Sequence, residues 1–266
     1  MNDATNLGTA VVTGATGGVG ALYAQGLADR GYDLLLVGRQ EKALKELAEK
    51  ISKSSGRTVN IAAHDLSNAG ELNTLASRLS GDSSVSLLAN IAGTSSFSPF
   101  IKLGSDDIAQ TIAINVTALT QLSHAVAPGF VERGKGTIVN FASVLAFRPW
   151  AEFNVYNATK AYVVMLSQSL QADLGEKGVL VQVVAPPATA TPFWANAGFN
   201  VENLPAKAVM KSEDLVSAAL VGLDNGESWV LPSLGDVSVW EAFQSARTEL
   251  VKSMMNGTPA ERYTKG

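Results

Sequence analysis

The stretch Thr9-Ala10-Val11-Val12-Thr13-Gly14-Ala15-Thr16-Gly17-Gly18-Val19-Gly20 decides the fold of this chain. It begins as an apolar, β-branched run, turns at a cluster of glycines, and continues into a helical pattern from Gly18 to Arg30. Gly14, Gly18 and Gly20 let the backbone approach a pyrophosphate closely, and the helix N-terminus then presents free N–H groups to that anion. A tight turn without a ligand is the alternative, but a glycine turn between a first strand and a helix favours dinucleotide binding.

Apolar runs and amphipathic stretches alternate along the rest of the chain. The pattern predicts strands at 9–13, 33–37, 58–63, 85–90, 136–141, 179–185 and 229–231. It predicts helices at 18–30, 41–52, 106–133 and 154–175, and a short one that begins near 67. The stretch 106–133 can be one long helix, or a short helix that leads into a long one. The strands are continuously apolar, as expected when helices cover both sheet faces, and the alternation implies right-handed crossovers. We therefore expect an α/β fold with three layers, built on a doubly wound parallel sheet.

A length of 266 residues favours one domain covering 1–266 over two domains. The segment 186–211 interrupts the pattern with prolines and with Phe193, Trp194 and Phe199. Because connections of this length often bind ligands, we expect it to be a substrate loop. The last residues, 256–266, are predicted to form a mobile tail.

Composition argues against several classes of partner. The net charge is −4 without a basic stripe, which disfavours nucleic acid. No apolar run approaches the roughly 20 residues that span a bilayer, so no membrane insertion is expected. The polar start, 1–6, does not resemble a signal peptide, and the lack of cysteine fits a reducing cytoplasm. His64 and His124 have no metal-ligand spacing around them, so no metal site is predicted.

Ser143, Tyr156 and Lys160 carry the chemistry that the sequence predicts. Tyr156 and Lys160 are four positions apart, so both project from one face of a helix. A free tyrosine has a pKa of about 10, and a neighbouring ammonium is expected to lower it toward neutral pH. Ser143 follows an apolar run, where its hydroxyl can hold a substrate oxygen. Each residue alone would be ordinary (a cap, a core side chain, a surface charge), but together they suggest proton transfer beside a dinucleotide.

Arg39 follows the predicted second strand, where NAD-binding proteins usually place a carboxylate for the ribose hydroxyls. A guanidinium suits a 2′-phosphate, whereas a carboxylate would repel it. NADP is therefore the favoured cofactor, with NAD less favoured. The alternative is that Arg39 is only a solvated surface charge.

With these residues in place, the chain resembles the short-chain dehydrogenase/reductase family in its single-domain form, from about residue 8 to 235. The matching motifs, in chain order, are Thr13 to Gly20, Asp65-Leu66, Asn90-Ile91-Ala92-Gly93, Asn115, Ser143 and Tyr156-Asn157-Ala158-Thr159-Lys160. The resemblance implies a Rossmann fold and an NAD(P)-dependent oxidoreductase that acts on a carbonyl or secondary alcohol.

The resemblance also implies a role for each matching residue. Tyr156 would be the general acid/base, Ser143 would hold the substrate oxygen, and Lys160 would lower the pKa of Tyr156 and hold the nicotinamide ribose. Asn115 would position a water that relays protons to solvent. The implied catalytic residues are Asn115, Ser143, Tyr156 and Lys160, with Ser143 and Tyr156 also contacting substrate. The implied cofactor contacts are Gly14, Thr16, Gly17, Gly18, Val19, Gly20, Arg39, Asp65, Leu66, Asn90, Ala92, Gly93, Tyr156, Lys160 and Thr191.

One position departs from the family pattern. Pro187 stands where the family usually has glycine, and it fixes φ there. The path of the following loop over the nicotinamide, and with it the contact implied for Thr191, is therefore left open.

The expected substrate is a small apolar carbonyl compound or alcohol, because apolar side chains are common near the predicted site. The candidates are Phe97, Leu145, Phe147, Trp150, Phe153, Phe193, Trp194 and Phe199. A homodimer or homotetramer is expected through helices 106–133 and 154–175. The face predicted to serve it bears Ala158, Ala161, Val164, Met165 and Gln168.

Two other functions stay open at this point. An epimerase or dehydratase of the same fold usually carries a large domain after the sixth strand, for which about eighty residues leave little room. A nucleotide-sensing protein without catalysis typically lacks the tyrosine or the lysine, and both are present here.

Overall fold

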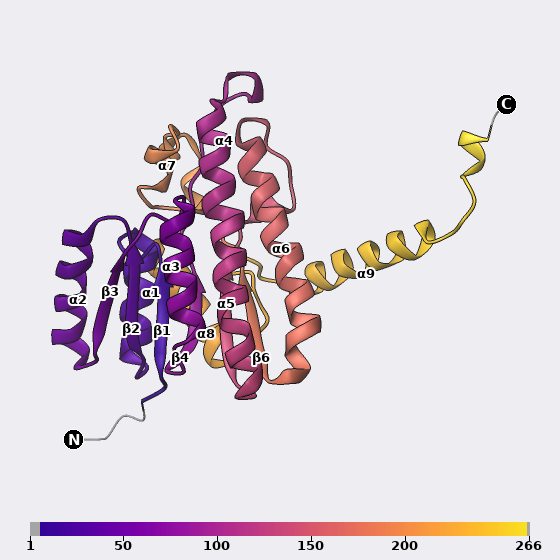
Figure 1. The fold of residues 1–266 in the computed structure, drawn as a ribbon. Coiled ribbons are helices and arrows are strands. Elements are labelled where there is room, and N and C mark those ends of the chain that lie inside the picture. Colours follow the sequence, from indigo (N-terminus) through magenta and orange to yellow (C-terminus); the bar gives the residue numbers. More distant parts are fainter. Residues whose placement is uncertain (1–5, 265–266) are drawn as a thin grey trace. The chain divides into compact units, whose positions relative to one another are not determined.

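A computed structural model describes residues 6–264 of the chain (Figure 1). These residues form two compact units, one up to Pro232 and one from Ser233 onward. The first unit contains a seven-stranded sheet in the order β3-β2-β1-β4-β5-β6-β9. All neighbouring strands in it are parallel. The prediction that one domain covers the whole chain stays a prediction.

The strands follow the predicted runs closely. They are β1 Thr9–Thr13, β2 Asp33–Gly38, β3 Val59–Ala63, β4 Val85–Asn90, β5 Gly136–Phe141, β6 Val179–Val184, β7 Ala188–Thr189, β8 Val209–Met210 and β9 Trp229–Val230. The α-helices are α1 Gly18–Asp29, α2 Glu41–Ser55, α3 Ala69–Ser80, α4 Ser105–Ile112, α5 Leu119–Glu132, α6 Asn154–Leu174, α7 Phe193–Asn196, α8 Ser212–Asp224 and α9 Val237–Met254.

Helices cover both faces of the sheet. Tyr23 of α1, Leu44 of α2 and Leu215 of α8 are buried in one apolar cluster with β1 and β2 side chains. Leu75 of α3 and Phe130 of α5 belong to a second cluster, and Figure 1 shows α3, α5 and α6 together in front of the sheet. The predicted three-layer, doubly wound α/β fold is confirmed.

The sheet order reverses beside β1. From β1 the chain steps outward to β2 and β3, then returns to place β4 on the other side of β1. In open α/β sheets such a switch point leaves a crevice at the carboxyl ends of the strands, and ligands bind there. Here the crevice lies where β1 ends at Thr13 and β4 ends at Asn90.

Two segments differ in detail from what their sequence indicated. The stretch predicted at 106–133 is α4, then a π-helical turn at Ala113–Ala118, then α5. The loop at 186–211 contains α7 and a two-stranded parallel pairing of β7 with β8. That pairing fixes both ends of the predicted substrate loop to each other.

The second unit consists mainly of α9. Asp236 caps its start by accepting a hydrogen bond from the Ser238 N–H at 2.9 Å. A 3-10 turn follows at Glu261–Tyr263. Of the predicted tail 256–266, residues 265–266 lie outside the described part, and the mobility of the tail stays a prediction. Between residues 6 and 264, no helix is both long and apolar enough to cross a membrane.

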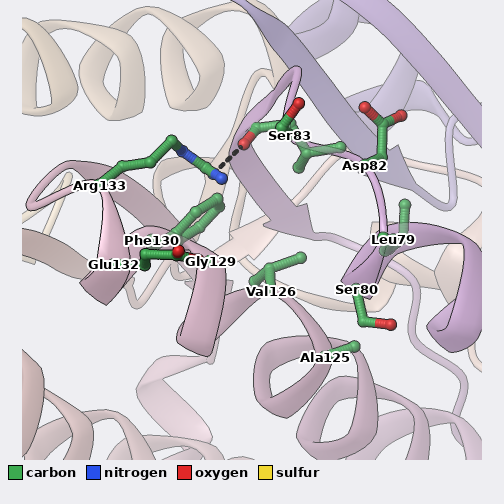
Figure 2. A pocket seen from close by; sticks show the side chains of 12 residues that line it. Leu79, Ser80, Asp82, Ser83, Ala125, Val126, Gly129, Phe130, Glu132 and Arg133 are labelled. Atoms are coloured by element: carbon green, nitrogen blue, oxygen red, sulfur yellow. Dashed lines mark hydrogen bonds between the residues drawn. The ribbon is translucent and has the colours of Figure 1, made fainter.

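A cavity of about 190 Å³ lies beside the start of β4, between the C-terminal ends of α3 and α5 (Figure 2). Phe130 and Val126 form part of its wall, and Arg133 closes one side by donating a hydrogen bond to the Val85 carbonyl at 2.8 Å. Val85 begins β4, so this cavity is at the amino edge of the sheet, opposite the switch-point crevice. None of the predicted site residues lines it.

We expect a substitution that enlarges this cavity to lower the free energy of unfolding substantially. Phe130 is fully buried, so Phe130→Ala should lower the free energy of unfolding by about 3–5 kcal/mol. Phe100→Ala removes the same ring from a side chain that is 64% exposed and should cost under about 1 kcal/mol. Urea unfolding of the two variants measures the difference, and equal losses would contradict the described packing.

Candidate active site

The glycine turn is closed so tightly that side chains are excluded from it. Gly14 has φ +67°, and a Cβ placed there would lie 2.8 Å from the Ala92 Cα. A Cβ on Gly20 would collide with the Gly14 carbonyl. No described side chain caps α1 at Gly17, so the N–H groups of its first turn face the crevice without a protein cap. The turn therefore fits a pyrophosphate, as its sequence predicts.

Thr13 joins the glycine turn to the end of β4. Its hydroxyl oxygen accepts hydrogen bonds from the N–H groups of Ile91 at 3.0 Å and Ala92 at 3.1 Å. This fixes the backbone of Ala92 and Gly93 against the turn. Thr13 was not among the predicted site residues, although its place at the head of the glycine motif was the available signal.

Arg39 and Asp65 lie near each other at the ends of β2 and β3. The Asp65 carboxylate accepts hydrogen bonds from the Ser67 hydroxyl at 2.7 Å and the Ser67 N–H at 2.9 Å. These bonds lower the pKa of Asp65, and the Arg39 charge adds to the effect. The Leu66 side chain is buried in the core with Leu75, so its side chain serves packing rather than the crevice.

Asn90 points into the protein. Its amide donates to the Asn140 side chain at 2.9 Å and to the Ser123 hydroxyl at 3.1 Å, and Asn140 donates to Ser167 at 2.9 Å. All four side chains are buried. The Asn90 side chain thus joins α5, β4, β5 and α6 beneath the crevice, and any cofactor contact is left to its backbone.

Ser143, Tyr156 and Lys160 are brought together as predicted. Ser143 follows β5, and its hydroxyl oxygen accepts a hydrogen bond from the Leu145 N–H at 3.1 Å. Tyr156 is on the first turns of α6 and is hydrogen-bonded to the Ser143 side chain. One helical turn later, the Lys160 Nζ lies 5.6 Å from the centre of the Tyr156 ring.

Burial sets the protonation of this pair. It raises the pKa of Tyr156 to about 12, and the Ser143 hydrogen bond only partly opposes the rise. It lowers the pKa of Lys160 from 10.5 to about 8. The lowered tyrosine pKa expected from the sequence is therefore not found in the free protein, because desolvation outweighs the Ser143 hydrogen bond. At neutral pH Tyr156 is a protonated phenol, ready to donate a proton.

Lys160 is held at the sheet edge. Its Nζ donates to the Phe141 carbonyl, the last residue of β5, at 2.7 Å, and the residue is 5% exposed. A Cβ on Gly93 would lie 3.7 Å from that Nζ and 3.4 Å from the Asn115 Oδ1. Gly93, Asn115 and Lys160 therefore meet at one point.

Asn115 lies in the π-helical turn, and both the oxygen and the nitrogen of its side-chain amide form hydrogen bonds within the protein. Its Oδ1 accepts from the Thr94 N–H at 2.9 Å, and its Nδ2 donates to the Thr94 carbonyl at 2.9 Å and to the Thr159 hydroxyl at 3.0 Å. Thr159 in turn donates to the Tyr156 carbonyl at 2.8 Å. Asn115 thus fixes the segment after Gly93 to α6, and the proton relay implied for it stays a prediction.

The loop after β6 reaches the glycine turn despite Pro187. A Cβ on Gly18 would lie 3.7 Å from the Thr191 methyl carbon, which places Thr191 at the N-terminus of α1. The Ser212 hydroxyl donates to the Ala190 carbonyl at 2.8 Å and holds this part of the loop. Thr191 therefore lies at the crevice, in the region where the family pattern expects it.

Most of the predicted apolar candidates form one aromatic cluster around Tyr156. Its members are Phe97, Leu145, Trp150, Phe153, Tyr156, Ala188, Phe193, Trp194, Ala197, Phe199, Val201 and Leu204. The Phe193 ring centre lies 5.5 Å from that of Tyr156, and the Trp194 indole donates to the Thr189 carbonyl at 2.7 Å. Phe147 packs against a separate cluster with Ala142 and Val163, and its place at the pocket stays a prediction.

No group of three or more His, Cys, Asp or Glu side chains placed to hold a metal ion occurs among residues 6–264. The polar groups at the site are instead hydroxyls, amides, the Lys160 amine, the Arg39 guanidinium beside Asp65 and backbone N–H groups, which suit a nucleotide and a carbonyl oxygen.

Comparison with known proteins agrees with this geometry. A family profile described as short chain dehydrogenase matches residues 8–201. The human inactive hydroxysteroid dehydrogenase-like protein 1 is 34% identical over 194 residues, 71% of this chain and 58% of that protein. Rat very-long-chain 3-oxoacyl-CoA reductase is 37% identical over 186 residues, 68% of this chain and 59% of that protein. The chain thus spans about three fifths of the length of these curated relatives.

Two solved structures match nearly the whole chain. A short-chain dehydrogenase from Sphingobium yanoikuyae in complex with NADPH is 40% identical with a TM-score of 0.93, covering 96% of this chain and 100% of that one. The bulky-bulky ketone specific alcohol dehydrogenase from Comamonas testosteroni is 37% identical with a TM-score of 0.90, covering 98% and 100%.

Fold, motifs and matches point to one class, proteins with a doubly wound parallel α/β sheet and a glycine turn after its first strand. Within that class, the chain belongs to the short-chain dehydrogenase family. The family predicted from its motifs is confirmed.

The buried amine predicts a pH dependence of stability. The pKa of Lys160 is about 8 in the folded chain and near 10.5 when unfolded. Between these values the unfolded chain binds more protons, so stability rises with pH. The raised pKa of Tyr156 has the opposite effect, but only above its unfolded value of about 10.

Urea unfolding from about pH 8 to 10 tests this. The free energy of unfolding of the unmodified protein should rise, relative to Lys160→Met, by up to about 1.4 kcal/mol per pH unit. Lys42→Met, at a side chain that is 92% exposed, should keep the slope of the unmodified protein. Parallel curves for all three proteins would rule out a depressed Lys160 pKa.

Proposed function

We propose that this protein is an NADP-dependent oxidoreductase that transfers hydride between the nicotinamide and a ketone or secondary alcohol with bulky apolar substituents. The observation that carries the proposal is the Ser143–Tyr156–Lys160 constellation at the carboxyl edge of the sheet, in which Ser143 and Lys160 are buried and Tyr156 is half-buried, beside a turn that only glycine can form. The bound cofactor supplies the hydride. The chain positions the cofactor and the substrate and supplies the protons.

The crevice residues divide between holding the nucleotide and handling the proton. The glycine turn and the start of α1 would bind the pyrophosphate, and Lys160 would reach the nicotinamide ribose. In the reductive direction Tyr156, a protonated phenol in the free protein, donates its proton to the substrate oxygen. Ser143 donates a hydrogen bond to the same oxygen and stabilises its developing charge. Lys160, whose pKa is about 8, can then return a proton to the site.

NADP is favoured over NAD by the end of β2. Gly38-Arg39-Gln40 offers no carboxylate to the ribose, and the Arg39 charge is felt by Asp65 nearby. The Sphingobium relative was solved with NADPH. A guanidinium at this position would pair with a 2′-phosphate.

An apolar, bulky substrate is favoured by the aromatic cluster. The Tyr156 ring itself belongs to this cluster, so a substrate oxygen at its hydroxyl would place the substituents against Phe193 and its neighbours. The Comamonas relative is specific for bulky-bulky ketones. Polar sugars would leave hydroxyl groups without partners on such a wall.

The remaining predictions also stand as proposals. Tyr162 and Met165 on α6 are 38% and 56% exposed, which supports a homo-oligomer through α5 and α6. Val164, placed on the same face from the sequence, is buried in the core instead, so that assignment is wrong. The cytoplasmic location predicted from the lack of cysteine stays a prediction.

A nucleotide-binding protein without catalysis is the second candidate, favoured by one observation. The human relative at 34% identity is named inactive. The two candidate functions differ in whether removal of the Tyr156 hydroxyl affects turnover or only cofactor binding.

Tyr156→Phe separates them. With NADPH and a panel of aryl alkyl ketones, the variant should lose about 10²–10⁴-fold in turnover, because it lacks the acid that protonates the oxygen. NADPH affinity by fluorescence titration should change little. Tyr162→Phe, which removes a hydroxyl bonded to Thr120 at 2.9 Å, should retain turnover. Absence of turnover in the unmodified protein across the panel, with tight NADPH binding, would favour the non-catalytic candidate.

Arg39→Asp tests the choice of cofactor. Loss of a charged hydrogen-bond donor and gain of a repelling carboxylate should weaken NADPH by at least about 10–100-fold and leave NADH unchanged or tighter. Arg78→Asp on α3 makes the same charge change away from the predicted nucleotide contacts and should affect both cofactors little. Equal weakening of NADPH and NADH by Arg39→Asp would refute the 2′-phosphate contact.

A further inference from the structure

Asn157 is a buried polar residue that the proposed mechanism does not use. It directly follows Tyr156 on α6 and is 8% exposed. Its Nδ2 donates a hydrogen bond to the Trp150 carbonyl at 3.0 Å, seven residues earlier in the chain. Its Oδ1 is buried and has no hydrogen-bond partner in the part of the chain that the structure describes. The amide therefore contributes to the fold through its bond to Trp150.

The position of Trp150 is set by the residues that follow it. Arg148 and Pro149, which precede it, are exposed and lie outside helices and strands. The Trp150 carbonyl accepts a second hydrogen bond, from the Phe153 N–H at 2.9 Å. Asn157 belongs to α6, and Phe153 belongs to the 3-10 turn directly before this helix. These two donors therefore fix Trp150 to the start of α6.

The Trp150 ring is part of the aromatic cluster around Tyr156. Its centre lies 5.2 Å from that of Phe153, 5.7 Å from that of Phe199 and 6.3 Å from that of Phe97, each time in an edge contact. The Phe153 ring centre in turn lies 6.0 Å from that of Tyr156. Because aromatic pairs prefer particular geometries, a displaced Trp150 ring would change the shape of the wall beside Tyr156.

We propose that Asn157 is a positioning residue that sets the preference for bulky ketones, and that it acts through Trp150. The helical turn that carries Tyr156 then also holds the wall against which a bulky substituent packs. A ketone with small substituents has few atoms to pack against this wall, so its reaction depends little on Trp150. The inference rests on the proposed function and extends it from the reacting oxygen to the selection of the substrate.

Gln171 on the same helix provides a matched control. Its side-chain amide also donates to backbone carbonyls, that of Val181 at 2.9 Å and that of Ser228 at 3.0 Å. It lies about four helical turns after Tyr156, away from the aromatic cluster. Replacing either amide by leucine removes hydrogen bonds of the same kind. Both changes should therefore lower stability, whereas only Asn157→Leu should change the selectivity between ketones.

Kinetics with two ketones and NADPH measure this selectivity. Isobutyrophenone carries a phenyl and an isopropyl group on its carbonyl carbon, whereas acetone carries two methyl groups. In Asn157→Leu, KM for isobutyrophenone should rise about 3–10-fold more than KM for acetone, which is the factor that one hydrogen bond contributes. The loss should appear in KM rather than in kcat, because the wall contacts the substrate equally before and during hydride transfer.

The control decides between selectivity and a general loss of structure. Gln171→Leu should leave the ratio of kcat/KM for the two ketones as it is in the unmodified protein. An unchanged ratio in Asn157→Leu, or the same change of ratio in both variants, would overturn the proposal. Asn157→Ser allows the same comparison if leucine prevents folding, because its side chain is polar but too short to reach the Trp150 carbonyl.

A double-mutant cycle tests whether Asn157 acts through Trp150. Trp150→Leu should by itself lower kcat/KM for isobutyrophenone. Adding Asn157→Leu should then change that constant by less than about twofold, because the carbonyl no longer positions an aromatic ring. Losses that multiply in the double variant would show that Asn157 acts by another route and would contradict the proposal.

Two further measurements do not require turnover. Hydrogen exchange of the segment 148–153 should be about 3–10-fold faster in Asn157→Leu than in Gln171→Leu, because the Trp150 carbonyl has lost one of its two donors. Titration calorimetry with the NADPH complex should show weaker binding of isobutyrophenone in Asn157→Leu alone. Equal exchange rates and equal Kd values in the two variants would refute the role of Asn157.

These measurements also separate this inference from the proposed function. If the unmodified protein reduces neither ketone, the proposed function fails. A Kd for isobutyrophenone that is still raised only by Asn157→Leu would then support the positioning of Trp150 by Asn157 in a protein that binds ketones without reducing them.

Discussion

The hydrogen bond from the Lys160 amine to the Phe141 carbonyl is the contact on which the site depends. It fixes α6 to the last residue of β5 at 2.7 Å and so sets where Tyr156, one turn earlier, meets Ser143. The amine also lies beside the loop after β4, where a Cβ on Gly93 would be 3.7 Å from it, an ordinary contact distance. An amine held in this way has lost most of its water. The burial that positions Tyr156 and Lys160 therefore shifts the pKa of each residue in the direction that favours its uncharged form.

The sequence was sufficient for the fold and for predicting that Ser143, Tyr156 and Lys160 lie together, while their roles stay predictions. Continuous apolar strands, the glycine turn and the Tyr156–Lys160 spacing each report a local constraint, and each was found where it was predicted. The sign of the Tyr156 pKa shift was not accessible in that way. It depends on the burial of Tyr156, to which the Phe193 ring contributes only after the loop following β6 has folded over it.

Other differences have the same origin in long-range packing. Asn90 is directed inward because Asn140, fifty residues later, lies beside it on the neighbouring strand. Val164 reads from the sequence as a surface residue, but it is buried in a cluster with Val163. A short polar or apolar motif shows what a residue can do, whereas the element packed against it decides which side it faces.

The pairing of β7 with β8 has a consequence for recognition. Together with the Trp194 indole held by the Thr189 carbonyl and the Phe97 N–H bonded to the Ala197 carbonyl at 2.7 Å, it keeps the wall above Tyr156 assembled in the free protein. A ligand that enters therefore needs to order only a few residues. Most of the conformational entropy that closing a flexible lid would cost is already lost when the protein folds. Discrimination between ligands should accordingly arise from shape against a rigid surface rather than from how well each one induces closure.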